Sequence, residues 1–248
     1  MAKSFVGGIA LATLVVTGSA MAADLRPVYK AAPPVFSWTG YYIGVHTGAA
    51  WGLKENTFTT ATLTNDDQQS INGFLGGAQV GVNYQLDSWV LGAEAQFSWS
   101  NLEGKDNCIA ASPVALLNCH TKVDWLGTAA ARLGFAFDRT MVFVKGGAAW
   151  VHDKYDVTFF AAPFRTVQVD DTRYGWMFGA GVEHAFSGNW SAKVEYDYLD
   201  FGTSTTNFPG LRTLIADINE AVDIRQRIHL IKFGVNYRFA AGPVIAKY

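Results

Sequence analysis

Apolar and polar residues alternate with a period of two along most of the chain from Thr39 onward. Such alternation predicts β-strands that have one apolar and one polar face. The runs are roughly 12 to 17 residues long, and a tilted strand needs only about 9–11 residues to cross a bilayer. Eight runs show the pattern: Thr39–Trp51, Ile71–Gln85, Ser88–Asn101, Thr121–Phe137, Thr140–Lys154, Thr172–Ser187, Trp190–Phe201 and Arg227–Phe239.

The connections between these runs alternate between short and long. The short ones are Leu86-Asp87, Asp138-Arg139 and Gly188-Asn189. The long ones are Gly52–Ser70, Leu102–His120, Tyr155–Asp171 and Gly202–Gln226. Outer-membrane barrels have short periplasmic turns and longer extracellular loops. The pattern therefore predicts an all-β fold, an eight-stranded antiparallel up-and-down transmembrane barrel with four long extracellular loops.

The apolar face carries aromatic residues at both ends of the runs, as membrane interfaces favour. A soluble barrel would turn this large apolar face inward, whereas here the small or polar face suits a narrow lumen. The short-turn belt contains Tyr41, Tyr84, Trp89, Phe135, Phe137, Phe186, Trp190 and Tyr237, and the long-loop belt contains Trp51, Trp99, Trp125, Trp150, Trp176 and Tyr198.

Composition agrees with a β-structure in an apolar solvent. Charged residues make up 16% of the 248 residues and aromatic residues 14%, against about 25% charged residues in ordinary soluble proteins. This composition excludes intrinsic disorder, and the formal net charge of −2 gives no electrostatic case for nucleic-acid binding.

The N-terminus indicates export. Lys3 precedes an apolar stretch from Phe5 to Val16, and small residues then lead to an Ala-x-Ala site with cleavage expected between Ala22 and Ala23. The alternative, a membrane anchor, needs about 20 apolar residues. We therefore divide the chain into a signal peptide (1–22), a Pro-containing periplasmic lead-in (23–38), the barrel (39–239) and a C-terminal extension (240–248).

The inward face collects five acids and five bases, which predicts a lumen closed by salt bridges. An eight-stranded barrel is only wide enough for side chains to fill it, and buried charges must pair. A narrow or transient pore is the alternative. The expected network is Glu94, Asp124, Arg132, Lys145, Glu183, Lys193, Glu195, Asp197, Lys232 and Arg238.

The chain shows no catalytic or metal-ligand motif. His152-Asp153 and Asp170-Asp171 lie where a rim protease would place Asp and His pairs, but solvated loop charge explains them better. We expect no enzyme activity and no cofactor. Haem capture by a loop histidine such as His120 is an alternative. The histidines lack metal-ligand spacing: they are His46, His120, His152, His184 and His229.

Cys108 and Cys119 are the only two cysteines, and both lie in the second long loop. Because the compartment is oxidising, we expect them to form a disulfide. In the chain-entropy model, closing so short a loop contributes roughly 3 kcal/mol.

The segment Trp38-Thr39-Gly40-Tyr41-Tyr42-Ile43-Gly44, after a Pro-rich lead-in, resembles the start of small alphaproteobacterial outer-membrane β-barrel proteins, the "porin family" of rhizobia, brucellae and bartonellae. The end of the chain, 232–239, resembles the signal read by the barrel-assembly machinery. Its key residues are Lys232, Gly234, Tyr237 and Phe239. In most such proteins the last Phe ends the chain, whereas here nine residues follow.

This resemblance implies an eight-stranded barrel in the outer membrane and no single activity. Members are described as structural, immunogenic, pore-forming or haem-binding. We expect a structural surface protein, with a small-solute pore or a haem or host-ligand receptor as alternatives. Expected partners are outer-membrane lipid and lipopolysaccharide, and the assembly machinery during biogenesis.

Overall fold

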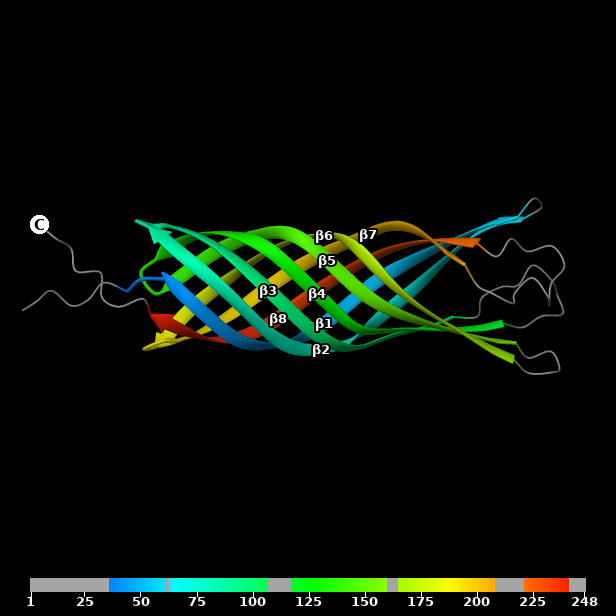
Figure 1. Ribbon diagram of the computed structural model, residues 1–248, viewed down its shortest axis with the longest axis horizontal. Coiled ribbons are helices and arrows are strands. Elements are labelled where there is room, and N and C mark those ends of the chain that lie inside the picture. Colours follow the sequence, from blue (N-terminus) through cyan, green and yellow to red (C-terminus); the bar gives the residue numbers. More distant parts are fainter. Residues whose placement is uncertain (1–35, 61–62, 107–116, 160–164, 208–220, 241–248) are drawn as a thin grey trace, which may run out of the picture. The chain divides into compact units, whose positions relative to one another are not determined.

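The computed structural model describes residues 36–60, 63–106, 117–159, 165–207 and 221–240. These residues form one closed barrel in which each strand pairs with the next and β8 pairs with β1 (Figure 1). The predicted eight-stranded antiparallel barrel is confirmed. The strands are β1 (Gly40–Thr60), β2 (Leu63–Leu86), β3 (Trp89–Asp106), β4 (Leu117–Phe137), β5 (Thr140–Phe159), β6 (Arg165–Ser187), β7 (Trp190–Asn207) and β8 (Ala221–Ala240).

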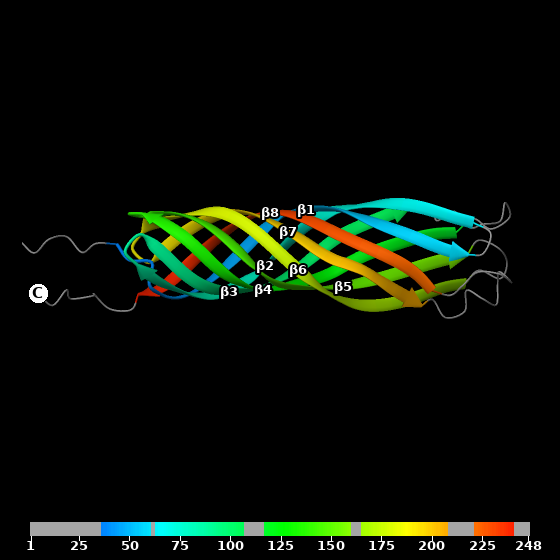
Figure 2. The ribbon, with the colours of Figure 1, turned by 90° about the horizontal axis from the view of Figure 1, so that it is seen from above.

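The ring closes because β1 has partners on both sides along its length. Gly40, for example, pairs with Asn83 of β2 and with Ala240 of β8. A closed ring leaves no edge strand, so backbone groups within the hydrocarbon are hydrogen-bonded. The described residues contain no helix that is long and apolar enough to cross a membrane. The start of β1 and the end of β8 lie at the same end of the barrel (Figure 2).

The three short turns lie at that same end, and each contains a residue with positive φ. These residues are Asp87 at 52°, Asp138 at 54° and Gly188 at 48°. Asp and Gly adopt this left-handed conformation more readily than most residues, and tight hairpins require it. The turn-forming residues in the sequence therefore produce the alternation of short and long connections.

At the opposite end, the strands continue well beyond the predicted runs. Thr60 of β1 still pairs with Leu63 of β2, and Phe159 of β5 pairs with Arg165 of β6. Much of the four predicted long connections is thus strand. Polar side chains hide the alternation here, but the backbone still gains hydrogen bonds by continuing the ladder.

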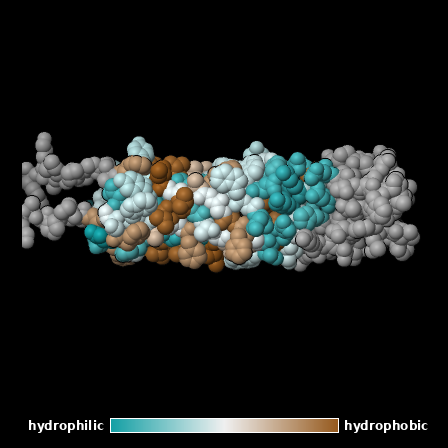
Figure 3. All heavy atoms as spheres, turned by 90° about the horizontal axis from the view of Figure 1, so that it is seen from below, coloured by the Kyte–Doolittle hydropathy of each residue, from teal (hydrophilic) through white to brown (hydrophobic). Residues whose placement is uncertain are grey.

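The outer wall carries large apolar side chains between two sets of aromatic residues. Tyr41, Trp89 and Phe137 are exposed near the short turns, and Trp51, Trp99 and Trp176 are exposed toward the other end. In Figure 3, apolar residues gather around the part of the barrel nearer the short turns, and a hydrophilic zone follows on the side of the long connections. This distribution suits a barrel that crosses a bilayer and extends beyond it.

Asp124 is the one predicted lumen charge whose side chain lies outside the barrel. A β-bulge between Val123 and Trp125 of β4 shifts the alternation by one residue. Val123 is fully buried inside, and the Asp124 carboxylate lies outside, 2.5 Å from Lys154 Nζ and 3.6 Å from Lys122 Nζ. An extra residue in one strand exchanges the faces beyond it, so strict alternation failed at this point.

Candidate functional site

The candidate site is the interior of the barrel, where the structure buries nine of the ten predicted lumen charges. Eight of these nine form ion pairs in the half of the barrel nearer the short turns, and hydrogen bonds of the Tyr42 hydroxyl join the Arg132–Glu183 pair to the other six. We call this set the ionic network. Four are acids and four are bases, and they project from six strands, β3 to β8. The members are Glu94, Arg132, Lys145, Glu183, Lys193, Glu195, Asp197 and Lys232.

Glu195 of β7 lies at the centre of this network. Its carboxylate is 3.0 Å from the ammonium groups of Lys145, Lys193 and Lys232. Asp197, the next inward residue on β7, is 3.3 Å from Lys145 and 2.5 Å from Lys232. A Cβ at position 179 would overlap the Asp197 carboxylate, so Gly179 leaves the space that this acid occupies.

Two further acids complete the charge balance. Glu94 lies 2.7 Å from Lys193 and 3.2 Å from Lys145, and it also accepts a 2.8 Å hydrogen bond from the Tyr42 hydroxyl. Glu183 lies 2.5 Å from Arg132. Because every buried charge in the network has an opposite charge within 4 Å, the desolvation cost is offset by Coulomb attraction and hydrogen bonds.

Neutral polar side chains extend the network across the lumen. Gln96 donates to Glu94 at 2.7 Å and to Glu195 at 2.8 Å, and its oxygen accepts from Lys232. His46 Nε2 lies 2.7 Å from Ser98 Oγ, and His46 Nδ1 lies 3.1 Å from Gln79 Oε1. His46 is therefore a lumen residue held by hydrogen bonds.

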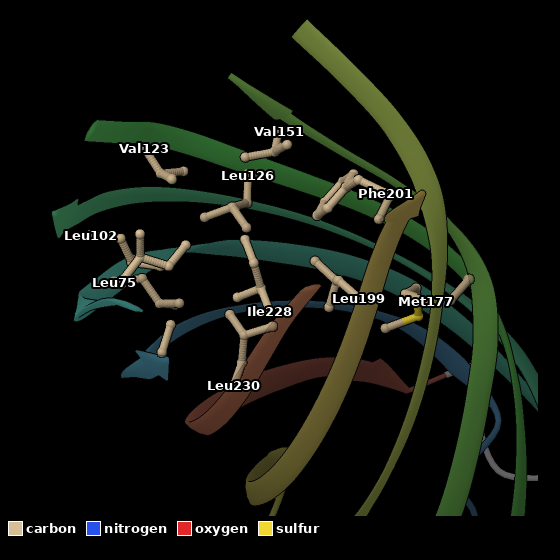
Figure 4. Packing of buried hydrophobic residues seen from close by; sticks show 14 residues of the cluster. Leu75, Leu102, Val123, Leu126, Val151, Met177, Leu199, Phe201, Ile228 and Leu230 are labelled. Atoms are coloured by element: carbon tan, nitrogen blue, oxygen red, sulfur yellow. The ribbon is translucent and has the colours of Figure 1, made fainter. Parts of the chain in front are cut away.

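An apolar layer fills the lumen next to the network, toward the long connections (Figure 4). Sequence reasoning did not separate this layer from the polar inner face. The residues of this layer come from all eight strands, and the side chains labelled in Figure 4 point into the interior of the barrel. The layer contains Ala50, Ile71, Leu75, Leu102, Val123, Leu126, Ala130, Ala149, Val151, Met177, Leu199, Phe201, Ile228 and Leu230.

A small cavity of about 10 Å³ lies where the apolar layer meets the network. That volume corresponds to about one water molecule. Its lining combines both kinds of side chain: Gln96, Ser98, Leu126, Thr128, Leu199, Leu230 and Lys232. Charged and apolar side chains therefore meet here with room for one water molecule.

A second buried ionic cluster lies near the long connections. Lys54 Nζ is 3.0 Å from Asp153 Oδ1, and Arg173 Nε lies 3.8 Å from Asp153 and 3.3 Å from Asp171. Tyr155 lies beside Lys54 and Asp153. The sequence pattern did not indicate this cluster, because Lys54 falls in a predicted loop. Its inward position follows once the alternation is continued past Trp51.

Arg238 is inside the barrel but outside the ion-pair network. It is 7% exposed, and its guanidinium lies 4.3 Å from the Phe36 ring and 5.4 Å from the Trp38 ring. Among the described residues, its Nε has no hydrogen-bond partner. The faces of aromatic rings attract cations. Here the two rings partly stabilise the Arg238 charge, as a carboxylate would.

The candidate rim protease pair is not assembled. Asp153 is fully buried in the lumen, whereas His152 stacks on Trp125 with the ring centroids 5.5 Å apart. His152 Nδ1 lies 3.1 Å from Thr172 Oγ1. Because neighbours in a strand face opposite sides, these two groups cannot act together on one substrate.

The other histidines are likewise engaged. His120 lies 3.6 Å from Glu103 and 4.0 Å from Asp156, and His229 stacks on Trp51. Exposed His184 lies 2.9 Å from the Thr140 hydroxyl. Within the described part of the chain, no three His, Cys, Asp or Glu residues are grouped to hold a metal ion.

Some predicted sites fall outside the described residues. The cleavage site at Ala22 and Ala23 does so, and so does Cys108 with the side chain of Cys119, so the signal cleavage and the disulfide stay predictions. The assembly-signal residues lie in β8. Lys232 and Gly234 face the lumen, and Phe239 is 49% exposed on the outer wall.

A closed, all-β, antiparallel barrel with an apolar outer wall and a filled lumen defines an outer-membrane β-barrel protein. The family model described as "Outer membrane protein beta-barrel domain" matches residues 9–239. The chain therefore belongs to this family of outer-membrane proteins.

Relatives agree with this assignment. The chain is 38% identical over 237 residues to the 31 kDa outer-membrane immunogenic protein of Brucella melitensis, covering 89% of this chain and 94% of the relative. It is 27% identical to the 25 kDa outer-membrane immunogenic protein of Brucella abortus, covering 93% of this chain and 96% of the relative. The predicted resemblance and the outer-membrane location are confirmed.

Among solved structures, the outer membrane protease OmpT of Escherichia coli is similar with a TM-score of 0.50 and 8% identity. The match covers 82% of this chain and 98% of OmpT. At that identity, the similarity concerns the fold alone.

Proposed function

We propose that this protein is a structural surface barrel of the outer membrane with a non-conducting lumen. The observation that carries the proposal is the filling of the lumen by two stacked layers, the ionic network and the apolar layer. An ion would have to enter the apolar layer without its water, which costs several kcal/mol or more. The barrel wall then serves to anchor the extracellular ends of the strands at the cell surface.

The related Brucella proteins are named immunogenic outer-membrane proteins. We extend this to the present chain as a proposal that its extracellular ends are displayed to the outside. Lipid and lipopolysaccharide are the proposed partners of the outer wall. Lys122 and Lys154, whose side chains are 43% and 40% exposed, lie beside the long-loop aromatic belt. At that level they are placed to meet lipid phosphates.

Conductance measurement tests the proposal. We expect the refolded mature protein in a planar bilayer to show no discrete openings above baseline, under conditions in which a known large porin conducts. Stable openings of uniform size in the wild type would overturn the structural proposal in favour of the small-solute pore. A liposome-swelling assay with small sugars gives an independent readout of the same property.

A further inference from the structure

The short segment before β1 places an aromatic side chain inside the short-turn end of the barrel. Trp38 is only 1% exposed and packs in a cluster with Val90, Ala136, Met141 and Ala185. These four residues project inward from β3, β4, β5 and β6. Phe36 packs against the same cluster, with its ring edge-on to that of Trp38 at 5.2 Å. Trp38 therefore covers the ionic network on the periplasmic side.

Few polar contacts hold this segment. The Trp38 backbone N–H donates to Gln85 Oε1 at 2.7 Å, and Arg238 lies against both aromatic rings. The Trp38 indole N–H, although buried, has no acceptor among the described residues. A buried donor without a partner has lost its hydrogen bond to water, and moving the segment into water would restore that bond.

The apolar layer at the other side of the network is held quite differently. Its side chains project from strands that are hydrogen-bonded to neighbours on both sides. Such side chains cannot leave the lumen unless the barrel itself deforms. The network thus lies between one boundary fixed in the wall and one boundary that combines wall residues with Phe36 and Trp38 from a segment outside the ladder.

We infer that Phe36–Trp38 is a removable lid, and that the ionic network is a chamber that opens to the periplasm only. The inference rests on the proposed closed lumen and adds a direction to it. Water and small solutes exchange with the network when the lid lifts, while the apolar layer continues to block passage across the membrane. Lid opening alone therefore produces access without conductance.

Cysteine accessibility tests the lid. Ser191 is buried in the network, where its hydroxyl donates to Glu183 at 2.6 Å, so S191C places a thiol just behind the lid. The host protein carries C108S and C119S, and a charged methanethiosulfonate reagent is added to the folded barrel in detergent, where both ends are accessible. We expect slow labelling of S191C, and labelling at least ten-fold faster when W38A is added.

Matched variants separate the lid from general loosening. W89A removes an exposed tryptophan of the outer belt at the same end, and I231A shortens an exposed side chain on the outer wall of β8; neither should accelerate labelling. F36A removes the ring beneath Arg238 and should accelerate it less than W38A. F36A also provides the test if W38A fails to give the folded form on an unheated gel.

The outcomes are distinct. Unchanged labelling in both W38A and F36A, or equal acceleration by W89A, would overturn the lid. Conductance of W38A should stay at the wild-type baseline, and openings in W38A alone would show that the apolar layer is no barrier. Openings in the wild type would instead refute the closed lumen itself.

Discussion

The ionic network and the apolar layer fill neighbouring parts of one lumen by opposite means. Around Glu195, the network places three lysines within 3.0 Å of one carboxylate. Around Ile228, the apolar layer excludes polar groups and relies on packed volume. Charges that are buried together interact through Coulomb forces over several ångströms, whereas apolar side chains interact mainly with the side chains that they touch. The same barrel wall therefore encloses one region that is sensitive to single charges and one that is sensitive to shape.

In the proposed non-conducting lumen, the two layers therefore contribute to closure in different ways. Paired charges keep some affinity for water, and the cavity of about 10 Å³ lies at their boundary. The apolar layer offers water no hydrogen-bond partner and stays dry. The network also fixes the positions of side chains from six strands, which apolar packing does less specifically.

The largest effect on stability is expected when a central charge is removed from the network. Glu195→Ala leaves the three lysines with too few acids and should lower the free energy of unfolding by about 3–5 kcal/mol, less where water enters. Urea titration followed by unheated gel mobility in detergent measures this. Conductance should not rise, because the apolar layer remains.

Asp124→Ala is the matched control for that variant. It removes an acid from a Lys–Asp–Lys group on the outer wall, where ion pairs contribute about 0–1 kcal/mol. If the two variants lowered the free energy of unfolding equally, burial would not distinguish the network from the ion pairs on the outer wall.

A smaller effect is expected from a charge added to the lipid face. Ala131 is exposed on the outer wall, and Arg132, one residue further, is buried beside Glu183. Ala131→Arg should cost about 2–4 kcal/mol if the position lies at the bilayer midplane. Folding yield into liposomes measures it, with Asn65→Arg as the comparison in the part of β2 that lies farthest from the short turns. If both variants fold equally well, the assignment of faces in β4 is wrong.

The smallest effect should come from one methyl group in the apolar layer. Ile228→Val should lower stability by about 0.5–1.5 kcal/mol through a lost contact and a small cavity, with no conductance. Ile231 on the same strand is 40% exposed on the outer wall, and Ile231→Val should change stability less. The same urea titration compares them, and a larger loss for Ile231→Val would place the packed core outside the lumen.

Much of the fold and part of the site could be predicted from local pattern. Alternation located the eight strands because a strand exposed to lipid must be apolar on that face. It also placed Glu94, Lys145 and Glu195 inside, because each is in phase with small residues of its run. It failed at Asp124, where a bulge changes the phase, and at Lys54, where a polar stretch conceals a continuing strand.

The sequence by itself determined the barrel, its membrane and the sign of each lumen charge, since these depend on periodicity and composition along one strand. Only the tertiary structure decided which charges meet and where the apolar layer lies. It also showed that Trp38 packs inside the short-turn end of the barrel, against Val90, Ala136, Met141 and Ala185. Those features depend on the register between strands far apart in the chain. A shift of a few ångströms in that register would pair Glu195 with different lysines while leaving the alternation of every strand unchanged.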